Sequence, residues 1–349
     1  MLGKQTAKHT EFAMEIAPLL FDLGPSKPTT RQIADLVKAG GADALTEAIR
    51  RADAARYQEV QCRSALNSVK GMPFKWTLNP YRGCTHGCHY CYARRYHAQF
   101  ELGADDEFAS VILVKTNLID VLRRELRKPS WSGELVAVGT ATDCYQPIEG
   151  LYKLTRGALE VLCEFNNPTS IVTKGPMIVR DKDVLIDLTS RTDCSVCVSV
   201  PCVDEDVWRA LEPGTAHPMQ RLRAVRELVD AGVYAGVLMS PIVPGFSSRP
   251  ALLERTMKAA VDHGARFIGS NVMHLEGGTR DHFMRWLEAE RPELVDGYRQ
   301  LYTSKYATTA YREEVKKVMS GLRAKCAVNS SGEERVGATR SLAPTTVNN

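Results

Sequence analysis

The stretch NPYRGCTHGCHYCYARRYH, residues 79–97, places three cysteines within eight residues. Cys84, Cys88 and Cys91 have the spacing C-x3-C-x2-C, and no fourth cysteine or histidine follows at the distance typical of a zinc finger. Thiolates suit both iron–sulfur clusters and zinc, but structural zinc sites normally use four protein ligands. Three thiolates can hold three irons of a 4Fe–4S cluster. The spacing therefore favours a cluster whose fourth iron stays open for a ligand from outside the protein.

The overall composition is that of an ordinary globular protein. The chain has 349 residues, of which 44% are hydrophobic and 25% charged, and its net charge is +4. That charge is too small to indicate nucleic-acid binding, although it does not oppose it. No apolar run is long enough to cross a membrane, and residues 1–12 lack the features of a secretory signal. We therefore expect a cytoplasmic protein without membrane contact, whose ten cysteines stay reduced and include metal ligands or catalytic thiols.

From about residue 70 onward, short β-rich runs alternate with amphipathic helical patterns. Strands are predicted at residues 75–79, 110–115, 134–142, 169–174, 195–200, 234–243 and 266–275. This alternation predicts an α/β fold with a parallel sheet. In barrels of this kind, the chemistry gathers at the carboxyl ends of the strands.

Three regions are predicted along the chain. Residues 1–60 have helical patterns and form a helical N-terminal extension, for which a helix-turn-helix DNA reader is a weakly supported alternative. Residues 61–325 form the α/β core. Residues 326–349 are polar, with little to bury, and are predicted to be a disordered tail.

The cysteine stretch resembles the signature of radical S-adenosylmethionine (SAM) enzymes, in which an aromatic residue, here Tyr90, precedes the third cysteine. The resemblance extends to SALNSVKGMPFKWTLNPYRGCTHGCHYCYAR, AVGTATDCYQPIEGLYKLTRGALEVL, IVTKGPMIVRD and MSPIVPG, and covers about residues 62–290. These segments are similar to the spore photoproduct lyase-like family, which is also labelled DNA-repair-photolyase-like. The resemblance implies a partial (β/α)6 TIM-type barrel.

The resemblance also implies a reaction. SAM would bind the open iron of the 4Fe–4S cluster through its amino and carboxylate groups. An electron, supplied by a reductant such as flavodoxin or ferredoxin, would cleave SAM to a 5′-deoxyadenosyl radical that removes a hydrogen atom from the substrate. The family resemblance implies DNA lesion repair. The alternative is a radical SAM enzyme that modifies a small molecule or peptide in secondary metabolism, and a zinc-binding scaffold is a third class.

Four residues are expected to bind SAM. Lys174 matches the lysine that meets the SAM carboxylate in the lyase, and a lysine at a strand end can offer a positive charge to that group. Ser199 matches a SAM-contacting serine less securely, and a plain strand serine is the alternative. Asp143 and Glu149 carry carboxylates that suit the SAM ammonium. Helix capping is the alternative for Asp143.

Three residues are candidates for radical transfer. Tyr90 and Tyr92 correspond to tyrosines that relay a radical in the lyase, and packing against the cluster is the alternative. Thr140 stands where the lyase has its hydrogen-donating cysteine. Cys144, four residues later, is either a replacement donor or a small buried thiol.

The other polar residues and cysteines are interpreted more simply. Cys194 and Cys197 lie on opposite faces of one strand, so a second cluster with Cys202 is not expected, although Cys202 could lie beside Cys144. Glu212 and Arg221 are expected to form an ion pair. Four cations are expected to surround the cluster mouth, where they would suit phosphate or form a solvated rim: Lys75, Arg82, Arg94 and Arg95.

Overall fold

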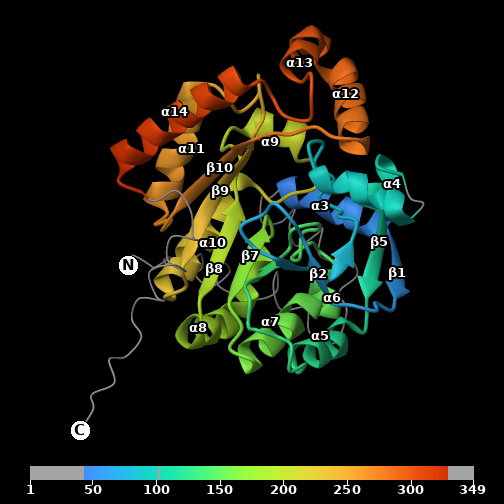
Figure 1. Ribbon diagram of the computed structural model, residues 1–349. Coiled ribbons are helices and arrows are strands. Elements are labelled where there is room, and N and C mark those ends of the chain that lie inside the picture. Colours follow the sequence, from blue (N-terminus) through green and yellow to red (C-terminus); the bar gives the residue numbers. More distant parts are fainter. Residues whose placement is uncertain (1–42, 101–102, 329–349) are drawn as a thin grey trace, which may run out of the picture.

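The computed structural model describes residues 43–100 and 103–328, and it is built on one large, twisted sheet (Figure 1). The seven strands of this sheet follow the order β10-β9-β8-β7-β6-β3-β2. Their bounds are β2 Leu66–Ser68, β3 Trp76–Leu78, β6 Val136–Val138, β7 Thr169–Thr173, β8 Cys194–Ser199, β9 Ala235–Ile242 and β10 Ile268–Val272.

Six neighbouring strands of this sheet, from β3 to β10, are parallel, and β2 pairs antiparallel at the edge. Each parallel strand leads through helical segments to the next, and the helices cover the outer face of the curved sheet (Figure 1). This architecture confirms the predicted partial (β/α)6 barrel. Each strand predicted from residue 134 onward is present within the predicted bounds or one residue beyond them.

A second, three-stranded sheet corrects one part of the prediction. It has the order β1-β5-β4, with bounds β1 Arg56–Val60, β4 Tyr81–Arg82 and β5 Val111–Lys115. The run 110–115 was expected in the parallel barrel, but β5 pairs parallel with β1 and antiparallel with β4. All five residues of β5 are buried. A continuous apolar run reports burial but not the partner strand, so its sheet could not be predicted.

The N-terminal extension is helical in only part of its described length. Helix α3 spans Asp43–Ala54, but residues 56–60, also predicted to be helical, form β1 because they pair with the exposed edge of β5. The prediction for residues 1–42 lies outside the described residues. At the other end, α14 spans Thr309–Cys326, and nearly all of the predicted tail also lies outside them.

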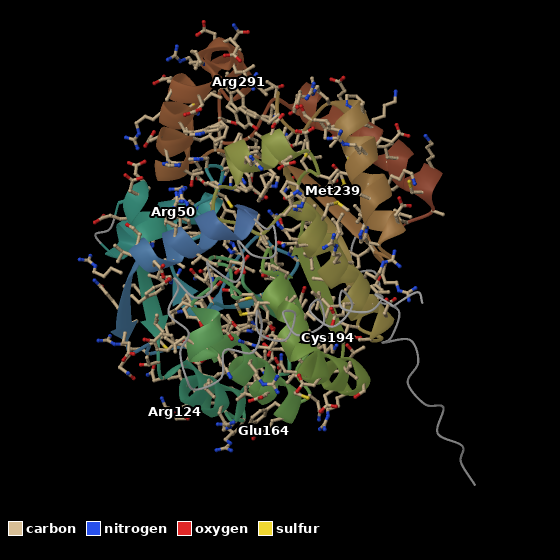
Figure 2. The ribbon with its side chains drawn as sticks, turned by 180° about the vertical axis from the view of Figure 1, so that it is seen from behind. Arg50, Arg124, Glu164, Cys194, Met239 and Arg291 are labelled. Atoms are coloured by element: carbon tan, nitrogen blue, oxygen red, sulfur yellow. The ribbon has the colours of Figure 1, made fainter. Side chains whose placement is uncertain are left out.

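Most of the remaining helices bury apolar side chains in the two large hydrophobic clusters of the protein. The remaining helices are η1 Tyr92–Phe100, α4 Asp106–Ser110, α5 Leu118–Leu126, α6 Glu149–Tyr152, α7 Leu154–Glu164, η2 Pro176–Asp181, α8 Lys182–Arg191, α9 Glu205–Leu211, α10 Pro218–Asp230, α11 Pro250–Asp262, α12 Gly278–Glu290, η3 Pro292–Leu294 and α13 Val295–Leu301. The apolar stripe of α5, which includes Leu118 and Leu126, is buried. Charged side chains such as Arg124 and Glu164 point outward, whereas Met239 of β9 is fully buried (Figure 2). None of the helices in the described ranges is both long and apolar enough to cross a membrane.

Lys115 provides a pH test of this packing. Its Nζ donates a hydrogen bond to the backbone oxygen of Asn79 at 2.7 Å. Burial, followed by the charge of Arg82, lowers the pKa of Lys115 from 10.5 to about 8. Because the unfolded chain binds more protons between these two pH values, this lysine's contribution to stability rises with pH across that window. We expect the free energy of unfolding in urea to rise between about pH 8 and pH 10 for the wild type relative to Lys115→Met. A difference that does not change with pH would contradict this interpretation.

Candidate active site

The three motif cysteines lie on one loop that follows the carboxyl end of β3. Cys84 and Cys88 are 7% and 5% exposed, and Cys91 is half-buried. Two backbone turns fold the loop, in which Gly87 N donates to Cys84 O at 3.1 Å and Cys91 N donates to Cys88 O at 3.3 Å. Gly87 has φ +61°, a conformation that favours glycine. All three thiols therefore come from a single compact loop.

Arg94 holds this loop from within the protein. Its guanidinium donates to the backbone oxygens of Cys88 at 3.1 Å, Gly87 at 2.8 Å and Asp105 at 2.8 Å. The side chain is 1% exposed. The prediction that Arg94 contributes to a basic rim is therefore wrong, because its donors bind carbonyl oxygens of the loop instead of facing solvent.

Gln146 holds the same loop from the other side, and its role was not predicted. Its Oε1 accepts from Thr85 N at 3.1 Å, and its Nε2 donates to Gly83 O at 3.2 Å and to Thr142 Oγ1 at 3.1 Å. The side chain is fully buried. A glutamine in a loop carries no sequence signal for its contacts with Gly83 and Thr85, because these contacts join segments about 60 residues apart.

The donor set of the loop fits a polynuclear iron–sulfur cluster. Cys84, Cys88 and Cys91 are free thiols, and burial raises the pKa of Cys88 to about 12 and that of Cys84 well above its usual value. A thiolate in this environment needs a cationic partner, and a bound metal deprotonates its thiol ligands. Among the described residues, no three His, Cys, Asp or Glu side chains converge on one metal-ion position. Cluster ligands need not converge in this way, because each binds a different iron.

A buried charged group lies beside the loop, formed by Lys174, Glu212, Arg221 and Tyr90. Arg221 is fully buried and donates to Glu212 Oε2 at 2.6 Å, which confirms the expected ion pair. The Tyr90 hydroxyl donates to Glu212 Oε1, and Lys174 Nζ lies 3.8 Å from the same oxygen. Burial opposes the charge of Lys174, but nearby Cys88 and Glu212 raise its pKa. With two cations and one carboxylate, the group keeps one excess positive charge.

Asp143 joins the cysteine loop to the end of β7. Its Oδ1 accepts from Thr173 Oγ1 at 2.6 Å and its Oδ2 from Lys174 N at 2.6 Å, and His86 Nδ1 lies 3.4 Å away. Burial opposes ionisation, but His86 and these hydrogen bonds together lower the pKa of Asp143. Asp143 also accepts from Tyr145 N, two residues later, and α6 begins only at Glu149, so it forms a local turn instead of capping a helix.

Glu149 occupies a different environment from the one expected. It is fully buried, and its carboxylate accepts from Tyr81 Oη at 2.5 Å, Thr155 N at 3.0 Å and Arg180 at 3.0 Å. Burial raises its pKa. This placement does not favour the predicted SAM contact, because protein groups already use the carboxylate to secure the start of α7.

Ser199 lies at the carboxyl end of β8, as predicted. Its Oγ donates to Ser240 O at 3.2 Å, and its backbone oxygen accepts from Arg221 at 3.0 Å. The residue is 2% exposed. The structure therefore connects Ser199 with the buried charged group through its backbone.

Tyr90 and Tyr92 point to different environments although they flank the same cysteine. Tyr90 is buried against Glu212, whereas Tyr92 is 37% exposed. The Tyr92 hydroxyl donates to the backbone oxygen of Thr140, the residue expected where the lyase has a cysteine. Tyr92, which follows Cys91 directly in the chain, therefore meets Thr140 just beyond the end of β6.

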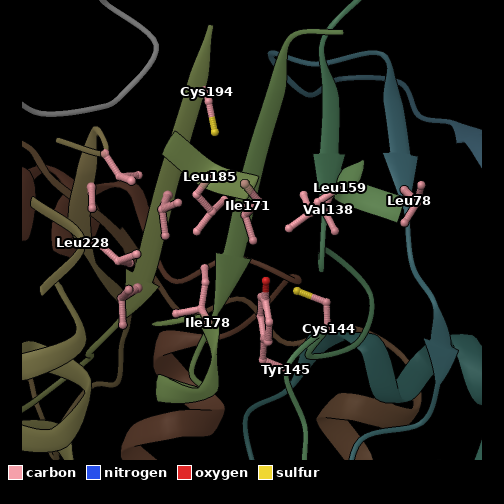
Figure 3. Close-up of a cluster of buried hydrophobic side chains, with 14 of the residues drawn as sticks. Leu78, Val138, Cys144, Tyr145, Leu159, Ile171, Ile178, Leu185, Cys194 and Leu228 are labelled. Atoms are coloured by element: carbon pink, nitrogen blue, oxygen red, sulfur yellow. The ribbon is translucent and has the colours of Figure 1, made fainter. Parts of the chain in front are cut away.

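Cys144 lies in the hydrophobic core. It is fully buried, its Sγ lies 3.7 Å from Val172 O, and a side chain at Gly139 would meet that sulfur at 2.9 Å. Figure 3 shows Cys144 beside Tyr145 and Ile178, beyond the carboxyl ends of the strands. This placement favours the interpretation of Cys144 as a small buried thiol.

We expect Cys144→Ala to leave the product profile of the enzyme unchanged. The substitution removes one buried sulfur from a packed cluster, and the expected loss of stability is about 1–2 kcal/mol. Product analysis by mass spectrometry and urea unfolding check the two halves of this prediction. A changed product at unchanged stability would instead assign Cys144 to hydrogen transfer.

Cys194 and Cys202 have surroundings different from those of Cys144. Cys194 begins β8, at the opposite end of the sheet from Cys144 (Figure 3). The Cys202 sulfur accepts from Asp204 N at 3.4 Å and lies near Thr256 of α11. These contacts place Cys202 among polar groups of α9 and α11, with no contact to Cys144 recorded in the described part of the chain.

The expected basic rim is incomplete. Lys75 precedes β3, at the end of the barrel opposite the cysteine loop, and pairs with Glu134 at 3.0 Å. Arg95 pairs with Glu276 near the loop. Arg82 is half-buried, and burial lowers its pKa. The prediction of four mouth cations is therefore wrong for Lys75 and Arg94, since strand direction and burial direct them elsewhere.

The two histidines of the cysteine motif, His86 and His89, are buried and half-buried, respectively. His86 is 5% exposed beside Asp143. His89 stacks on Trp286 at 4.7 Å between ring centroids, and its Nδ1 lies 3.1 Å from His282 Nε2. Helix α12 therefore packs directly on the cysteine motif, a contact that the sequence pattern does not reveal.

Comparisons with known proteins connect this arrangement with a family. A sequence profile described as the Radical SAM superfamily matches residues 78–256. An uncharacterised protein of Mycobacterium tuberculosis is 38% identical over 277 residues, which cover 78% of this chain and 82% of that protein. A radical SAM Nalpha-GlyT isomerase of Pseudomonas phage M6 is 26% identical over 168 residues, which cover 48% of this chain and 33% of the isomerase.

Solved structures of spore photoproduct lyase have the same fold. One, complexed with dinucleoside spore photoproduct, gives a TM-score of 0.60 at 16% identity, over 79% of this chain and 81% of the lyase. A variant of the lyase with bound AdoMet and dinucleoside spore photoproduct gives a TM-score of 0.60 at 15% identity, over 84% and 91% of the two chains. At this identity the likeness concerns the fold.

Proposed function

This chain belongs to the radical SAM superfamily, whose members are enzymes that use a 4Fe–4S cluster and SAM, and from this premise we propose that Cys84, Cys88 and Cys91 hold that cluster. When bound, the cluster supplies the electron that cleaves SAM to a 5′-deoxyadenosyl radical. The observation that carries the proposal is the position of three free thiols on one loop at the carboxyl end of a barrel strand. Arg94 and Gln146 keep the loop in shape.

Lys174 is the proposed partner of the SAM carboxylate. It follows β7, and its charge lies close enough to Cys88 to act on the pKa of that thiol. Its distance of 3.8 Å from Glu212 is long for an ion pair, and Glu212 is already bound by Arg221 and Tyr90. The excess positive charge of this group therefore favours an incoming carboxylate. Asp143 orients the backbone of Lys174 through its hydrogen bond to the Lys174 N–H.

We expect Lys174→Met to weaken SAM binding while the cluster is retained. Hydrogen bonds to charged groups contribute about 1.5–3 kcal/mol, which corresponds to a loss of affinity of roughly 10-fold to 100-fold. Isothermal titration of the reconstituted protein with SAM measures this loss, and iron analysis checks that the cluster is intact. Lys182→Met, which removes an exposed lysine of α8, is the matched control and should bind SAM normally. Unchanged SAM affinity in Lys174→Met would remove Lys174 from the site.

For the substrate, we propose a damaged or modified nucleobase in a nucleic acid, from which a hydrogen atom is abstracted. Support comes from the motifs shared with the lyase-like family and from the phage relative named for a GlyT isomerase. Tyr92, at the solvent side of Cys91, is the proposed group for radical relay, and Tyr90 is better suited to positioning because Glu212 holds its hydroxyl.

A second candidate is modification of a small molecule or peptide. Two points favour it: the family resemblance matches Thr140 to the hydrogen-donating cysteine of the lyase, and two of the four expected mouth cations lie elsewhere. An alcohol donates a hydrogen atom far less readily than a thiol, so a lyase-type final step would need another donor. This candidate predicts SAM cleavage without any affinity for oligonucleotides.

The two candidates are separated by one anaerobic experiment. Reconstituted protein is incubated with SAM, a chemical reductant and either UV-irradiated or untreated DNA, and 5′-deoxyadenosine is measured. The nucleic-acid substrate is supported if irradiated DNA stimulates SAM cleavage and if deuterium placed on the bases of that DNA is transferred to 5′-deoxyadenosine. Cleavage that no DNA stimulates leaves the second candidate, and absence of cleavage with an intact cluster contradicts both.

A further inference from the structure

Four rings form a row beside the cysteine loop, and none of them belongs to the cofactor site described above except Tyr92. The row consists of Tyr96, Tyr92, His274 and Tyr306, and we call it the aromatic strip. Successive ring centroids are 6.4, 5.8 and 6.0 Å apart. The strip therefore continues outward from the residue that follows Cys91.

Three separate segments build the strip and fix its geometry. Tyr92 and Tyr96 lie on η1, one helical turn apart, and His274 follows β10. Tyr306 lies between α13 and α14 and is joined to His274 by an antiparallel β-bridge. Leu275 N donates to Lys305 O at 2.7 Å in the same pairing. The rings are consequently presented from a hydrogen-bonded framework.

Two of the four rings of the strip, those of Tyr92 and Tyr306, are exposed at the surface. Tyr306 is 47% and Tyr92 37% exposed, whereas the other tyrosines in the described ranges are buried or half-buried. A large ring with a polar tip at the surface is typical of a binding face. Tyr96 is half-buried and packs against the cluster formed by Cys84, Ala93 and Phe108. The rings of Tyr92 and Tyr306 are therefore the part of the strip that an external partner can reach.

Cations lie over the strip. The guanidinium of Arg95 is 4.8 Å from the Tyr96 ring, and Lys305 and Arg312 lie 5.4 and 5.5 Å from the Tyr306 ring. One carboxylate, Glu276, pairs with Arg95 and lies 3.7 Å from Lys305. Within this group three cations therefore face one anion. Long cationic side chains can leave a ring face and reach a neighbouring anion, which opens the ring for stacking.

We propose that the aromatic strip binds unstacked bases of a single nucleic-acid strand that flank the reacting nucleotide. Rings that stack bases, combined with cations that contact the phosphates, are how proteins bind single strands without reading their sequence. A strand lying on the strip would lead toward Tyr92 and the cysteine loop. This inference rests on the nucleic-acid substrate proposed above and adds a site outside the reaction pocket.

Tyr306→Ala tests the stacking contact. The probe is a fluorescent oligothymidylate of about 12 nucleotides, whose binding to the full-length reconstituted protein is measured by anisotropy. Loss of one stacked base should weaken binding about 10-fold, and Tyr306→Phe should keep wild-type affinity because it keeps the ring. Uncoupled SAM cleavage should be unchanged in both variants. The matched control is Ile186→Ala, which truncates an exposed apolar side chain of α8. This variant should bind the oligonucleotide with wild-type affinity.

Arg312→Gln tests the phosphate contact independently. In a salt series, the slope of log affinity against log salt should decrease in magnitude by about 0.7, the value for one phosphate contact on a single strand. The matched control is Arg191→Gln, which removes an exposed arginine of α8. It should leave the slope unchanged. Circular dichroism melting of each variant shows that it is folded.

The outcomes separate this inference from the proposed function. Wild-type binding that is insensitive to Tyr306→Ala and Arg312→Gln overturns the aromatic strip but keeps a nucleic-acid substrate. Absence of any wild-type binding to the oligothymidylate overturns the aromatic strip, whereas the proposed nucleic-acid substrate stands or falls with the irradiated-DNA assay described above. Binding of an acidic Glu–Tyr copolymer in preference to the oligonucleotide assigns the strip to a peptide and also overturns the inference.

Discussion

Cys88→Ala is expected to lose the iron and acid-labile sulfide of the anaerobically reconstituted protein, and with them SAM cleavage. Cys88 is buried, is held through its backbone oxygen by Arg94 and lies within reach of the Lys174 charge. Removing one of three ligands leaves two thiolates for the whole cluster. Substitutions of groups that only orient ligands cost about 10–100-fold, so loss of a ligand should reduce SAM cleavage by more than roughly 100-fold.

Iron and sulfide analysis, visible absorbance and 5′-deoxyadenosine release measure this effect. Cys326→Ala is the matched control, since Cys326 is a half-buried free cysteine at the end of α14, well separated from the motif in the chain. It should retain iron and activity. A Cys88→Ala protein that still cleaves SAM would contradict the ligand assignment.

Glu212→Ala is expected to have the largest effect on stability. Glu212 is 3% exposed and accepts hydrogen bonds from Arg221 and Tyr90, with Lys174 nearby. Without the carboxylate, a fully buried guanidinium loses its counter-charge. Removing one partner of a buried ion pair costs about 3–5 kcal/mol, because the other charge is left uncompensated.

Urea unfolding of the cluster-free protein measures this loss without interference from metal binding. The double variant Glu212→Leu with Arg221→Met removes both charges and should recover much of the stability. Glu205→Ala breaks an exposed ion pair with Arg209 on the same helix, α9, and should cost no more than about 1 kcal/mol. An unchanged unfolding midpoint in Glu212→Ala would show that the buried pair contributes little.

The ion pair of Arg221 and Glu212 connects the ends of several elements with the cysteine loop. Arg221 donates to the Ser199 backbone oxygen at 3.0 Å and to Thr215 Oγ1 at 2.5 Å, so it joins the end of β8 to the start of α10. Glu212 uses its second oxygen for Tyr90 in the cysteine motif. The same group therefore contacts the loop through Tyr90, and Glu212 helps to keep Lys174 charged, as its proposed contact with an anionic ligand requires.

The sequence by itself determined the architecture and the identity of the cluster motif. Seven strands were predicted because strand and helix periodicities are local, and a parallel sheet follows from their alternation; six of the seven lie in the parallel part of the large sheet, and the run 110–115 does not. The spacing of Cys84, Cys88 and Cys91 is local too, so it indicated a chemistry without any knowledge of packing. Lys174 and Ser199 were predicted at strand ends for the same reason.

Only the tertiary structure decided where the polar side chains are used. Arg94 and Glu149 have charged side chains of the kind that bind ligands. Arg94 nevertheless holds the cysteine loop, and Glu149 secures the start of α7. The partner of β5 and the contact of α12 with His89 were likewise not predictable. A buried charge or an apolar strand takes its role from groups that are distant in the chain, and these become neighbours only when the chain folds.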